Sequence, residues 1–357
     1  MTPGRDDAPT AGAAIRLSFA PIVDLASLRA ALQDALRLEF FTIPPYLTAH
    51  HTLVRGGSRG AQYARSTIKD IVRDEMLHMN LVCNILNAIG GTPDIRAAVP
   101  SYPNTLPMAL AGGLKVHLKR YSHRLVEDVF MAIEKPEVPI DIPVGRAALA
   151  AATGPQTIGQ FYATIRSEII RQADDGIFAN PKHPQVNEFF TGRGENIMVT
   201  DRDSALLAID TIVEQGEGTP QSPTDLQHDI AHFYGFQQLA KAMQINPLPK
   251  PHFDPAATLA IDDVADVIQM VDDPQLVSID PADANAIALS NECDRQFSGI
   301  VEDLHAGFTG SPDRLSSIRD AMIDLGGSIN AVLAETLTAG PHAGLRAGPR
   351  FLYTPSP

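Results

Sequence analysis

Residues 71–91, with the sequence IVRDEMLHMNLVCNILNAIGG, form the segment that decides the predicted fold. Together with Ile68, its apolar residues recur at intervals of three and four, which is the pattern of one face of an α-helix. Glu75 and His78 occupy two positions on that face, where Leu or Ile would be expected. Because an unpaired carboxylate in a core costs several kcal/mol, such a group is normally neutralised, paired or bound to a metal ion. The segment therefore predicts a long buried helix that carries a polar site.

A first helix is predicted over residues 25–52, with Asp24 as its N-cap. Glu39 continues the apolar face of that helix. The Gly-rich turn RGGSRG at residues 55–60 joins the two helices, so we expect them to be antiparallel neighbours. The prolines at positions 44 and 45 predict either a kink in the first helix or an end and a restart at this point.

The remaining helices follow a long connection that is rich in Pro and Gly, which we interpret as a crossover. The pattern favours an all-α fold, a four-helix bundle with long crossover connections and extra C-terminal helices. The helices predicted after residue 93 cover 122–134, 157–172, 201–218 with Asp201 or Asp203 as the cap, 225–243, 282–306 and 313–337.

We predict one domain over residues 21–357, with a bundle core at about 24–243 and a C-terminal helical extension at about 260–357. Residues 1–20 are interpreted as a disordered leader, because acidic residues and Pro stand where a signal peptide needs a basic and then an apolar segment. Without a run of 18 apolar residues, no membrane span is expected. We expect a cytoplasmic protein, and a homo-oligomer is compatible with the sequence.

The composition narrows the classes of function. The net charge of −14 and the absence of a Lys and Arg cluster argue against a nucleic-acid partner. Only two cysteines occur, Cys83 and Cys293, and Cys83 lies in the buried helix. The sequence therefore predicts neither a disulfide framework nor a thiolate metal site.

Glu39 facing Glu75 and His78 across two antiparallel helices resembles half of a dinuclear metal site. Bundle sites for two iron or two manganese ions take one Glu from each of two helices and a Glu-x-x-His from each of the other two. The later predicted helices between residues 157 and 243 contain no second Glu-x-x-His, so other residues of these helices must supply the second half. The candidates for that half are Glu168, Glu214 or Glu217, and His228 or His232, and the combination we select is Glu168, Glu214 and His232.

Each assignment has a structural alternative. Glu39 would lie on the surface if the first helix were rotated by one residue, and Glu168 would belong to a solvated helix face. His228 and His232 stand four apart, so one of them is better explained by a structural role than by ligation. Tyr46 and Tyr162 are candidates for moving protons or electrons near the site, with simple aromatic packing as the alternative.

Several blocks of the sequence resemble the ferritin-like domain of the iminophenyl-pyruvate dimer synthase family, known from violacein and related bisindole pathways. The resemblance extends from about Leu25 to Tyr353. The blocks that carry it are LRAALQDALRLEFFTIPPYLTAHH (28–51), IKDIVRDEMLHMNLVCNILNAIGGTP (68–93), GGLKVHL (112–118), FMAIEKPE (130–137), TIGQFYATI (157–165), EQGEG (214–218), HFYGF (232–236), GFTGSPDRL (307–315) and AGPRFLY (347–353).

The resemblance implies a ferritin-like bundle with a carboxylate-bridged dinuclear centre, matched here by Glu39, Glu75 and His78. It implies an oxidoreductase of secondary metabolism that uses O₂ or peroxide to oxidise or couple a small amino-acid-derived substrate. The expected cofactor is iron, two ions per chain, with manganese as the alternative. Two further hypotheses remain: a ferroxidase or catalase-like protein that handles iron, and a metal-free helical scaffold.

Overall fold

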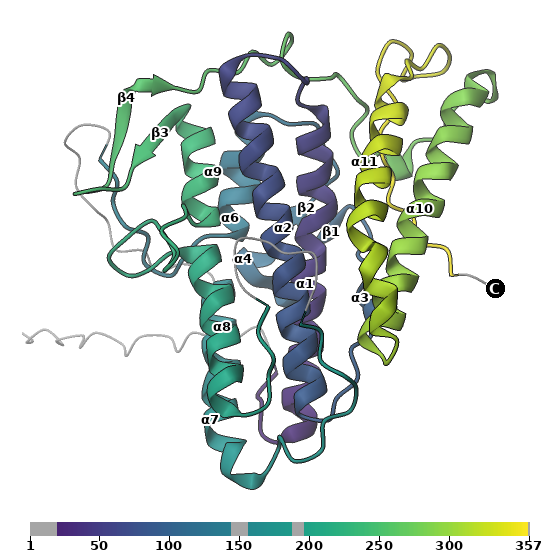
Figure 1. Ribbon diagram of the computed structural model, residues 1–357. Helices are drawn as coiled ribbons and strands as arrows, with labels where there is room; N and C mark the ends of the chain where they lie inside the picture. Colours follow the sequence, from purple (N-terminus) through teal and green to yellow (C-terminus); the bar gives the residue numbers. More distant parts are fainter. Residues whose placement is uncertain (1–19, 144–155, 188–195, 356–357) are drawn as a thin grey trace, which may run out of the picture.

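The computed structural model describes residues 20–143, 156–187 and 196–355, and these are mainly helical (Figure 1). Two long helices, α1 (Leu25–Thr52) and α2 (Arg59–Ala88), run side by side. Helices α7 (Ile158–Gln172) and α8 (Arg202–Glu217) pack on each other, and they also contact α1 and α2 respectively. The arrangement confirms the predicted all-α four-helix bundle.

Helix α1 begins at the predicted cap, where the Asp24 carboxylate accepts a hydrogen bond from the Ser27 N–H at 2.8 Å. It continues through both prolines, so the predicted break does not occur. Pro45 has no N–H to donate to the carbonyl oxygen of Phe41 four residues earlier. The Tyr102 hydroxyl donates to that oxygen instead, at 2.6 Å, and so replaces the missing bond.

The crossover between α2 and α7 contains a short, irregular helical segment. It consists of α5 (His123–Leu125), the π-helical turn η2 (Val126–Phe130) and α6 (Met131–Ile133). These limits agree with the predicted helix at 122–134. The preceding part of the crossover contains α3 (Ile95–Ala98), β1 (Asn104–Thr105), η1 (Pro107–Ala109), α4 (Leu110–Gly113) and β2 (Lys115–Val116), with β1 and β2 antiparallel.

Helix α9 (His232–Lys241) begins seven residues later than the helix predicted from residue 225. The residues before it form a loop instead, in which the Asp225 carboxylate accepts the Asp229 N–H at 2.9 Å. His228 has a φ of 69° in this loop, a left-handed conformation that a continuous helix does not allow. Beyond α9, the strands β3 (Met243–Asn246) and β4 (His252–Thr258) form an antiparallel hairpin where a loop was expected.

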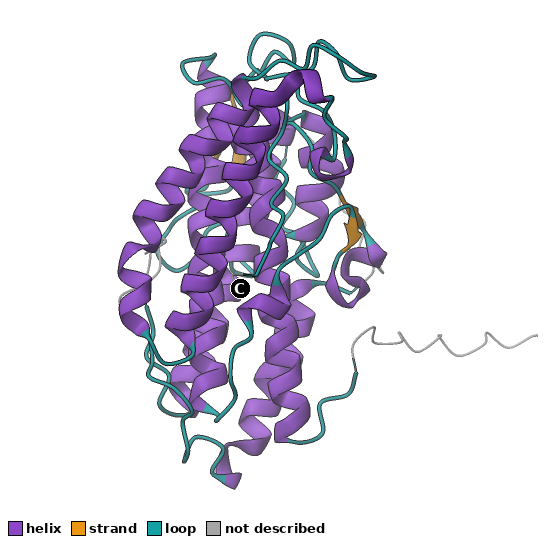
Figure 2. Ribbon diagram, turned by 90° about the vertical axis from the view of Figure 1, so that its right-hand side faces the viewer, coloured by secondary structure: helices purple, strands orange, loops and turns teal. Residues whose placement is uncertain are grey.

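Two C-terminal helices complete the described structure, as predicted. Helices α10 (Ala284–Phe308) and α11 (Ile318–Ala334) pack on each other and lie beside α1 (Figures 1 and 2). Short 3₁₀ turns are η3 (Ala173–Asp175), η4 (Pro274–Leu276), η5 (Pro281–Asp283) and η6 (Pro312–Ser317). Among the described residues, no helix is long and apolar enough to cross a membrane. The leader predicted at 1–20 lies, except for residue 20, outside the described residues, and the predicted division of the chain stays a prediction.

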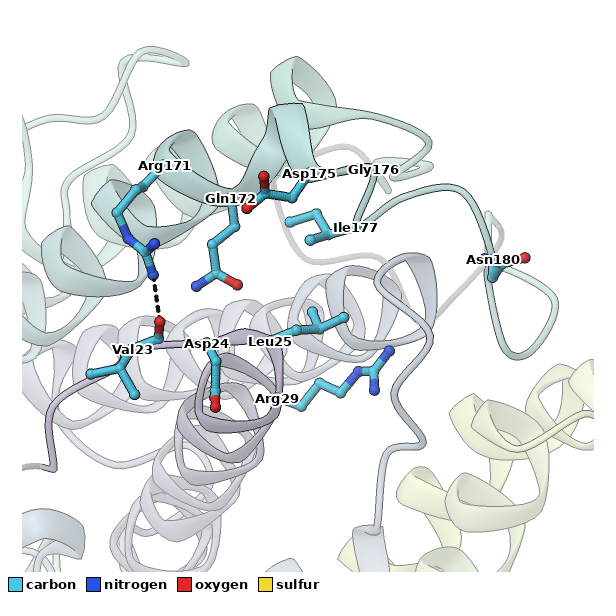
Figure 3. A pocket seen from close by; sticks show the side chains of 10 residues that line it. All are labelled: Val23, Asp24, Leu25, Arg29, Arg171, Gln172, Asp175, Gly176, Ile177 and Asn180. Carbon is cyan, nitrogen blue, oxygen red and sulfur yellow. Dashed lines mark hydrogen bonds between the residues drawn. The ribbon is translucent and has the colours of Figure 1, made fainter.

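A surface pocket of about 320 Å³ marks the place where the start of α1 meets the end of α7 (Figure 3). Arg171 on α7 donates to the carbonyl oxygen of Val23 at 2.9 Å. Arg29 on α1 donates twice to the carbonyl oxygen of Ile89, at 3.0 and 2.6 Å, just past the end of α2. Arg29 therefore stabilises the C-terminal end of α2, because a cation stabilises the free carbonyls of a helix C-terminus, and Arg171 links the end of α7 to the segment before α1.

Two histidines in the last turn of α1 are held in the neutral form. The Nδ1 of His50 lies 2.9 Å from the carbonyl oxygen of Arg65, and the Arg65 guanidinium lies 3.3 Å from Nε2. Burial, followed by the charges of His51 and Arg65, lowers the pKa of His50 to about 2. Burial also lowers the pKa of His51 to about 4.

This pair predicts a loss of stability in mild acid. Below pH 6.5 the unfolded chain takes up protons at both histidines and the folded chain does not, so the free energy of unfolding should fall as the pH falls from 6.5 to 5. The slope should approach about 1.4 kcal/mol per pH unit for each histidine. Denaturant unfolding should show a shallower slope for the double variant His50→Asn/His51→Asn. The exposed-site control His228→Asn should keep the wild-type slope, and equal slopes for all three proteins would contradict the assignment.

Candidate metal centre

Helices α1 and α2 bring Glu39, Glu75 and His78 together as the sequence predicted. All three side chains are buried, with exposed fractions of 4%, 2% and 2%. Each offers one ligand atom, and these atoms lie within 4.8 Å of one another. The rotation of α1 that would place Glu39 on the surface is therefore wrong. The first half of the predicted site exists as a compact buried group.

A second group consists of Glu75, Glu134 and His232, and its ligand atoms also lie within 4.8 Å of one another. Glu134 directly follows α6, and His232 is the first residue of α9. Both groups contain Glu75. The structure thus brings His232 to the site at the start of α9, which follows a loop and not the continuous helix predicted from residue 225.

Three aromatic rings fix the elements that carry this second group. The ring centroids of Tyr46 on α1 and Phe130 on η2 are 4.6 Å apart, and those of Tyr46 and Phe236 on α9 are 5.1 Å apart. Phe130 and Phe236 close the triangle at 5.2 Å. Because buried aromatic pairs at these separations are stabilising, they hold the crossover and α9 against the bundle.

Each unshared carboxylate accepts a hydrogen bond from a buried tyrosine. The Tyr46 hydroxyl donates to Glu134 Oε1 at 2.5 Å, and the Tyr162 hydroxyl on α7 donates to Glu39 Oε1. Burial and the neighbouring carboxylates raise the pKa of both tyrosines well above the ordinary value. Both therefore remain protonated donors. The structure places these two predicted residues at the cluster, in matching positions.

Each histidine has a further polar contact on the side away from its carboxylates. His78 Nδ1 lies 3.3 Å from Glu39 Oε2, and its Nε2 lies 2.8 Å from Gln215 Oε1 on α8. His232 Nδ1 lies 3.0 Å from Glu75 Oε1, and its Nε2 lies 3.4 Å from Asp74 Oδ2. These contacts direct Nδ1 of His78 toward Glu39 and Nδ1 of His232 toward Glu75, which leaves Nδ1 as the ligand atom of each histidine.

The cluster holds more acid than base. Four buried carboxylates, those of Glu39, Asp74, Glu75 and Glu134, face two imidazoles. Burial and then the charge of Glu134 raise the pKa of Glu75 to about 8. A protonated Glu75 also has an acceptor, because its Oε2 lies 2.9 Å from the Thr42 hydroxyl and that hydroxyl lies 2.8 Å from the Glu39 carbonyl oxygen.

This donor set fits divalent metal ions. Neither nitrogen of His232 makes a well-formed hydrogen bond, although the side chain is only 2% exposed. A buried imidazole whose nitrogens have only charged contacts with carboxylates, which are in excess here, is satisfied by a cation that replaces the retained protons. Carboxylates together with neutral imidazole suit iron, manganese or zinc better than calcium or magnesium.

Four of the residues considered for the second half lie outside both groups. Glu168 forms an ion pair with Arg171 at 2.6 Å, and His228 is exposed in the loop before α9. Glu214 is half-buried on α8, and the neighbouring residue in the sequence, Gln215, points to the cluster instead. Glu217 accepts the Gly159 N–H at 2.9 Å, and burial raises its pKa to about 7. The structure thus places Glu168 and Glu214 outside both groups, and their ligand roles stay predictions.

The sequence contained a signal for Glu134 that the prediction did not use. Val126, Phe130 and Glu134 stand four residues apart and share one buried face, so a carboxylate ends an apolar stripe here as it does at Glu75. The helix predicted at 122–134 is short and Pro136 follows it, so the end of this helix was interpreted as part of the connection. Gln215 was missed because an uncharged amide gives no metal-ligand signal in the sequence.

Comparisons with known proteins agree with this architecture and confirm the resemblance stated from the sequence. The family model described as Ferritin-like matches residues 32–241, which include both ligand groups. A curated protein from Chromobacterium violaceum, named 2-imino-3-(indol-3-yl)propanoate dimerase, is 26% identical over 269 residues. That match covers 66% of this chain and 25% of the relative, so the chain spans about a quarter of the relative's length.

A solved structure supports the same fold. The crystal structure of a ferritin-like protein from Caulobacter vibrioides superimposes with a TM-score of 0.62 and 22% sequence identity. The superposition covers 92% of this chain and 100% of that one. With a family model that matches more than half of its residues, the chain belongs to the Ferritin-like family.

Proposed function

We propose that this protein is a dinuclear metalloenzyme, with iron as its expected metal, that oxidises or couples a small amino-acid-derived substrate. The observation that carries the proposal is the pair of ligand groups that share Glu75. A carboxylate has two oxygens, so one buried Glu can serve two ions held by Glu39 and His78 on one side and Glu134 and His232 on the other. A bound pair of iron ions would supply the activation of O₂ or peroxide.

The residues around the ligands exclude water and keep protons in defined places. Tyr46 and Tyr162 donate to the two unshared carboxylates, and both side chains have an exposed fraction of 0%. Such buried donors can hold or release a proton at a ligand oxygen without contact with bulk water. This arrangement favours an enzyme over a scaffold, because a scaffold gains nothing from burying so many charges.

A cavity beside α2 and α9 supports the proposal that the substrate is a small organic molecule. Its volume is about 180 Å³, and Asp74 lies in its wall and also contacts His232. Most of its lining residues are polar, so this space suits the polar end of a small molecule. Asp74 and Asp229 would attract the amine or imine end of an amino-acid derivative. The name of the Chromobacterium violaceum relative, an imine dimerase, agrees with this substrate class.

The experiment that tests the function is turnover by the full-length protein loaded anaerobically with Fe²⁺. An amino-acid oxidase generates imines from tryptophan or phenylalanine in the same reaction. We expect O₂ consumption beyond that of the amino-acid oxidase alone, which itself uses O₂ to form the imine, and an oxidised or coupled product by mass spectrometry that is absent without the iron-loaded protein. O₂ consumption with iron alone, and no new organic product, would favour the ferroxidase alternative. Absence of bound metal after loading would favour the scaffold.

The tyrosines give a second prediction. Tyr46→Phe and Tyr162→Phe remove one hydroxyl each from the two unshared ligand carboxylates. We expect each variant to retain its metal and to lose turnover by about 10²-fold, the lower end of the range for proton transfer by a positioned side chain. Steady-state kinetics together with elemental analysis measure both quantities. Turnover equal to that of the wild type would show that these rings only pack.

Metal content gives a third prediction. Glu134→Gln removes a carboxylate that belongs to one group alone, so the bound metal should fall from about two ions to about one per chain. Glu75→Gln affects both groups and should lower the content further. Glu168→Gln and Glu214→Gln are matched controls outside the groups and should leave the content unchanged. Elemental analysis of protein purified without chelator measures all four, and unchanged metal in Glu134→Gln would contradict the assignment.

A further inference from the structure

The two ligand groups are alike in most respects. Each has one unshared carboxylate, Glu39 or Glu134, and each of these accepts a hydrogen bond from a buried tyrosine. Each has one histidine, and Glu75 belongs to both. A difference between two ions bound here must therefore come mainly from the groups that contact the histidines from behind.

The contact behind His78 is neutral. Gln215 is 2% exposed, and its Oε1 lies 2.8 Å from His78 Nε2. An amide oxygen fixes the tautomer of the imidazole but adds no negative charge. The Nε2 atom of Gln215 has no hydrogen-bond partner, so a buried amide donor remains unused beside this group.

The contact behind His232 is a carboxylate. Asp74 is 3% exposed, and its Oδ2 lies 3.4 Å from His232 Nε2. A carboxylate behind a ligand histidine raises the basicity of the imidazole, and removing such a partner typically lowers metal affinity 10–100-fold. Asp74 also adds a negative charge that the first group lacks.

We propose that the two positions are inequivalent: the position at His232 binds a divalent ion more tightly and fills first, and the position at His78 is the exchangeable one. An added ligand binds at the His78 position, where the ion is held less tightly. Gln215 and Asp74 are thus positioning residues, and they give the two ions different binding affinities. This inference rests on the proposed dinuclear site.

The test is an anaerobic titration of the metal-free full chain with Mn²⁺, followed by electron paramagnetic resonance. At one equivalent we expect the signal of isolated Mn²⁺ ions, and at two equivalents the signal of coupled pairs. Coupled pairs together with empty protein at one equivalent would show that the positions are equal or cooperative, and would overturn the inference.

Two isosteric variants assign the two steps. Asp74→Asn should weaken the tighter step about 10–100-fold, because the carboxylate behind His232 becomes a neutral amide. Gln215→Glu places a carboxylate behind His78 and should strengthen the weaker step, so that coupled pairs form at one equivalent. Asp210→Asn on α8 is the matched control, because that carboxylate pairs with Arg166 on the surface, and it should change neither step.

Circular dichroism and thermal unfolding of the metal-free variants establish that each has folded. If Asp74→Asn does not fold, Gln215→Glu still decides the question, since it adds a charge behind His78. Steps of unchanged affinity in folded Gln215→Glu would overturn the assignment of Gln215.

Azide tests which position accepts a ligand. In protein loaded with Co²⁺, azide should change the visible absorption only after the second equivalent of metal is bound. A change at the first equivalent would place ligand binding at the His232 position and contradict the proposal.

The result also separates this inference from the proposed function. Two Mn²⁺ ions bound with equal affinity would overturn the inequivalence and leave the dinuclear enzyme intact. Failure to bind any Mn²⁺ or Fe²⁺ would overturn the proposed function as well. Unequal binding in a protein that turns over no imine would support the inference and remove the proposed substrate.

Discussion

The burial of Glu75 among other carboxylates is the constraint on which the rest of the structure depends. A helix position that would normally carry Leu or Ile instead carries an acid with an exposed fraction of 2%. The neighbourhood is therefore built to neutralise it: the Thr42 hydroxyl lies at one oxygen and His232 at the other. Without a cation the cluster must retain protons, and the raised pKa of Glu75 expresses that cost.

The second half of the cluster comes from outside the bundle. The sequence pattern of dinuclear bundle sites led us to expect a Glu and a Glu-x-x-His from the later bundle helices. Those helices, α7 and α8, contribute Tyr162 and Gln215 instead, which contact ligand residues and do not themselves belong to either group. The carboxylate and the imidazole of the second group come from Glu134, which directly follows α6 in the crossover, and from His232 at the start of α9. The π-helical turn before Glu134 is an irregularity often found at functional sites.

Local sequence patterns predicted the elements well where periodicity was long and caps were clear. Helix α1 has the predicted bounds, and α8 begins at one of the two predicted caps, Asp201. The prediction failed before α9, because the His228 backbone and the Asp225 turn stop a helix that propensity alone would extend. Glu168, whose position on α7 matched a helix face, pairs with Arg171 and lies outside both groups. A helical period fixes which residues share a face, but not which face meets the core.

The amino-acid sequence was sufficient to predict the bundle and the first group of candidate ligands. Helical spacing places Glu75 and His78 side by side on one helix, and the short turn that joins the two helices makes α1, with Glu39, the neighbour of that helix. The members of the second group and the side chains that contact the two histidines became known from the tertiary structure alone. Glu134, Gln215 and His232 are separated from Glu75 by 59 to 157 positions. Their approach depends on how the crossover and α9 pack against the bundle, which is set by long-range contacts that no local period encodes.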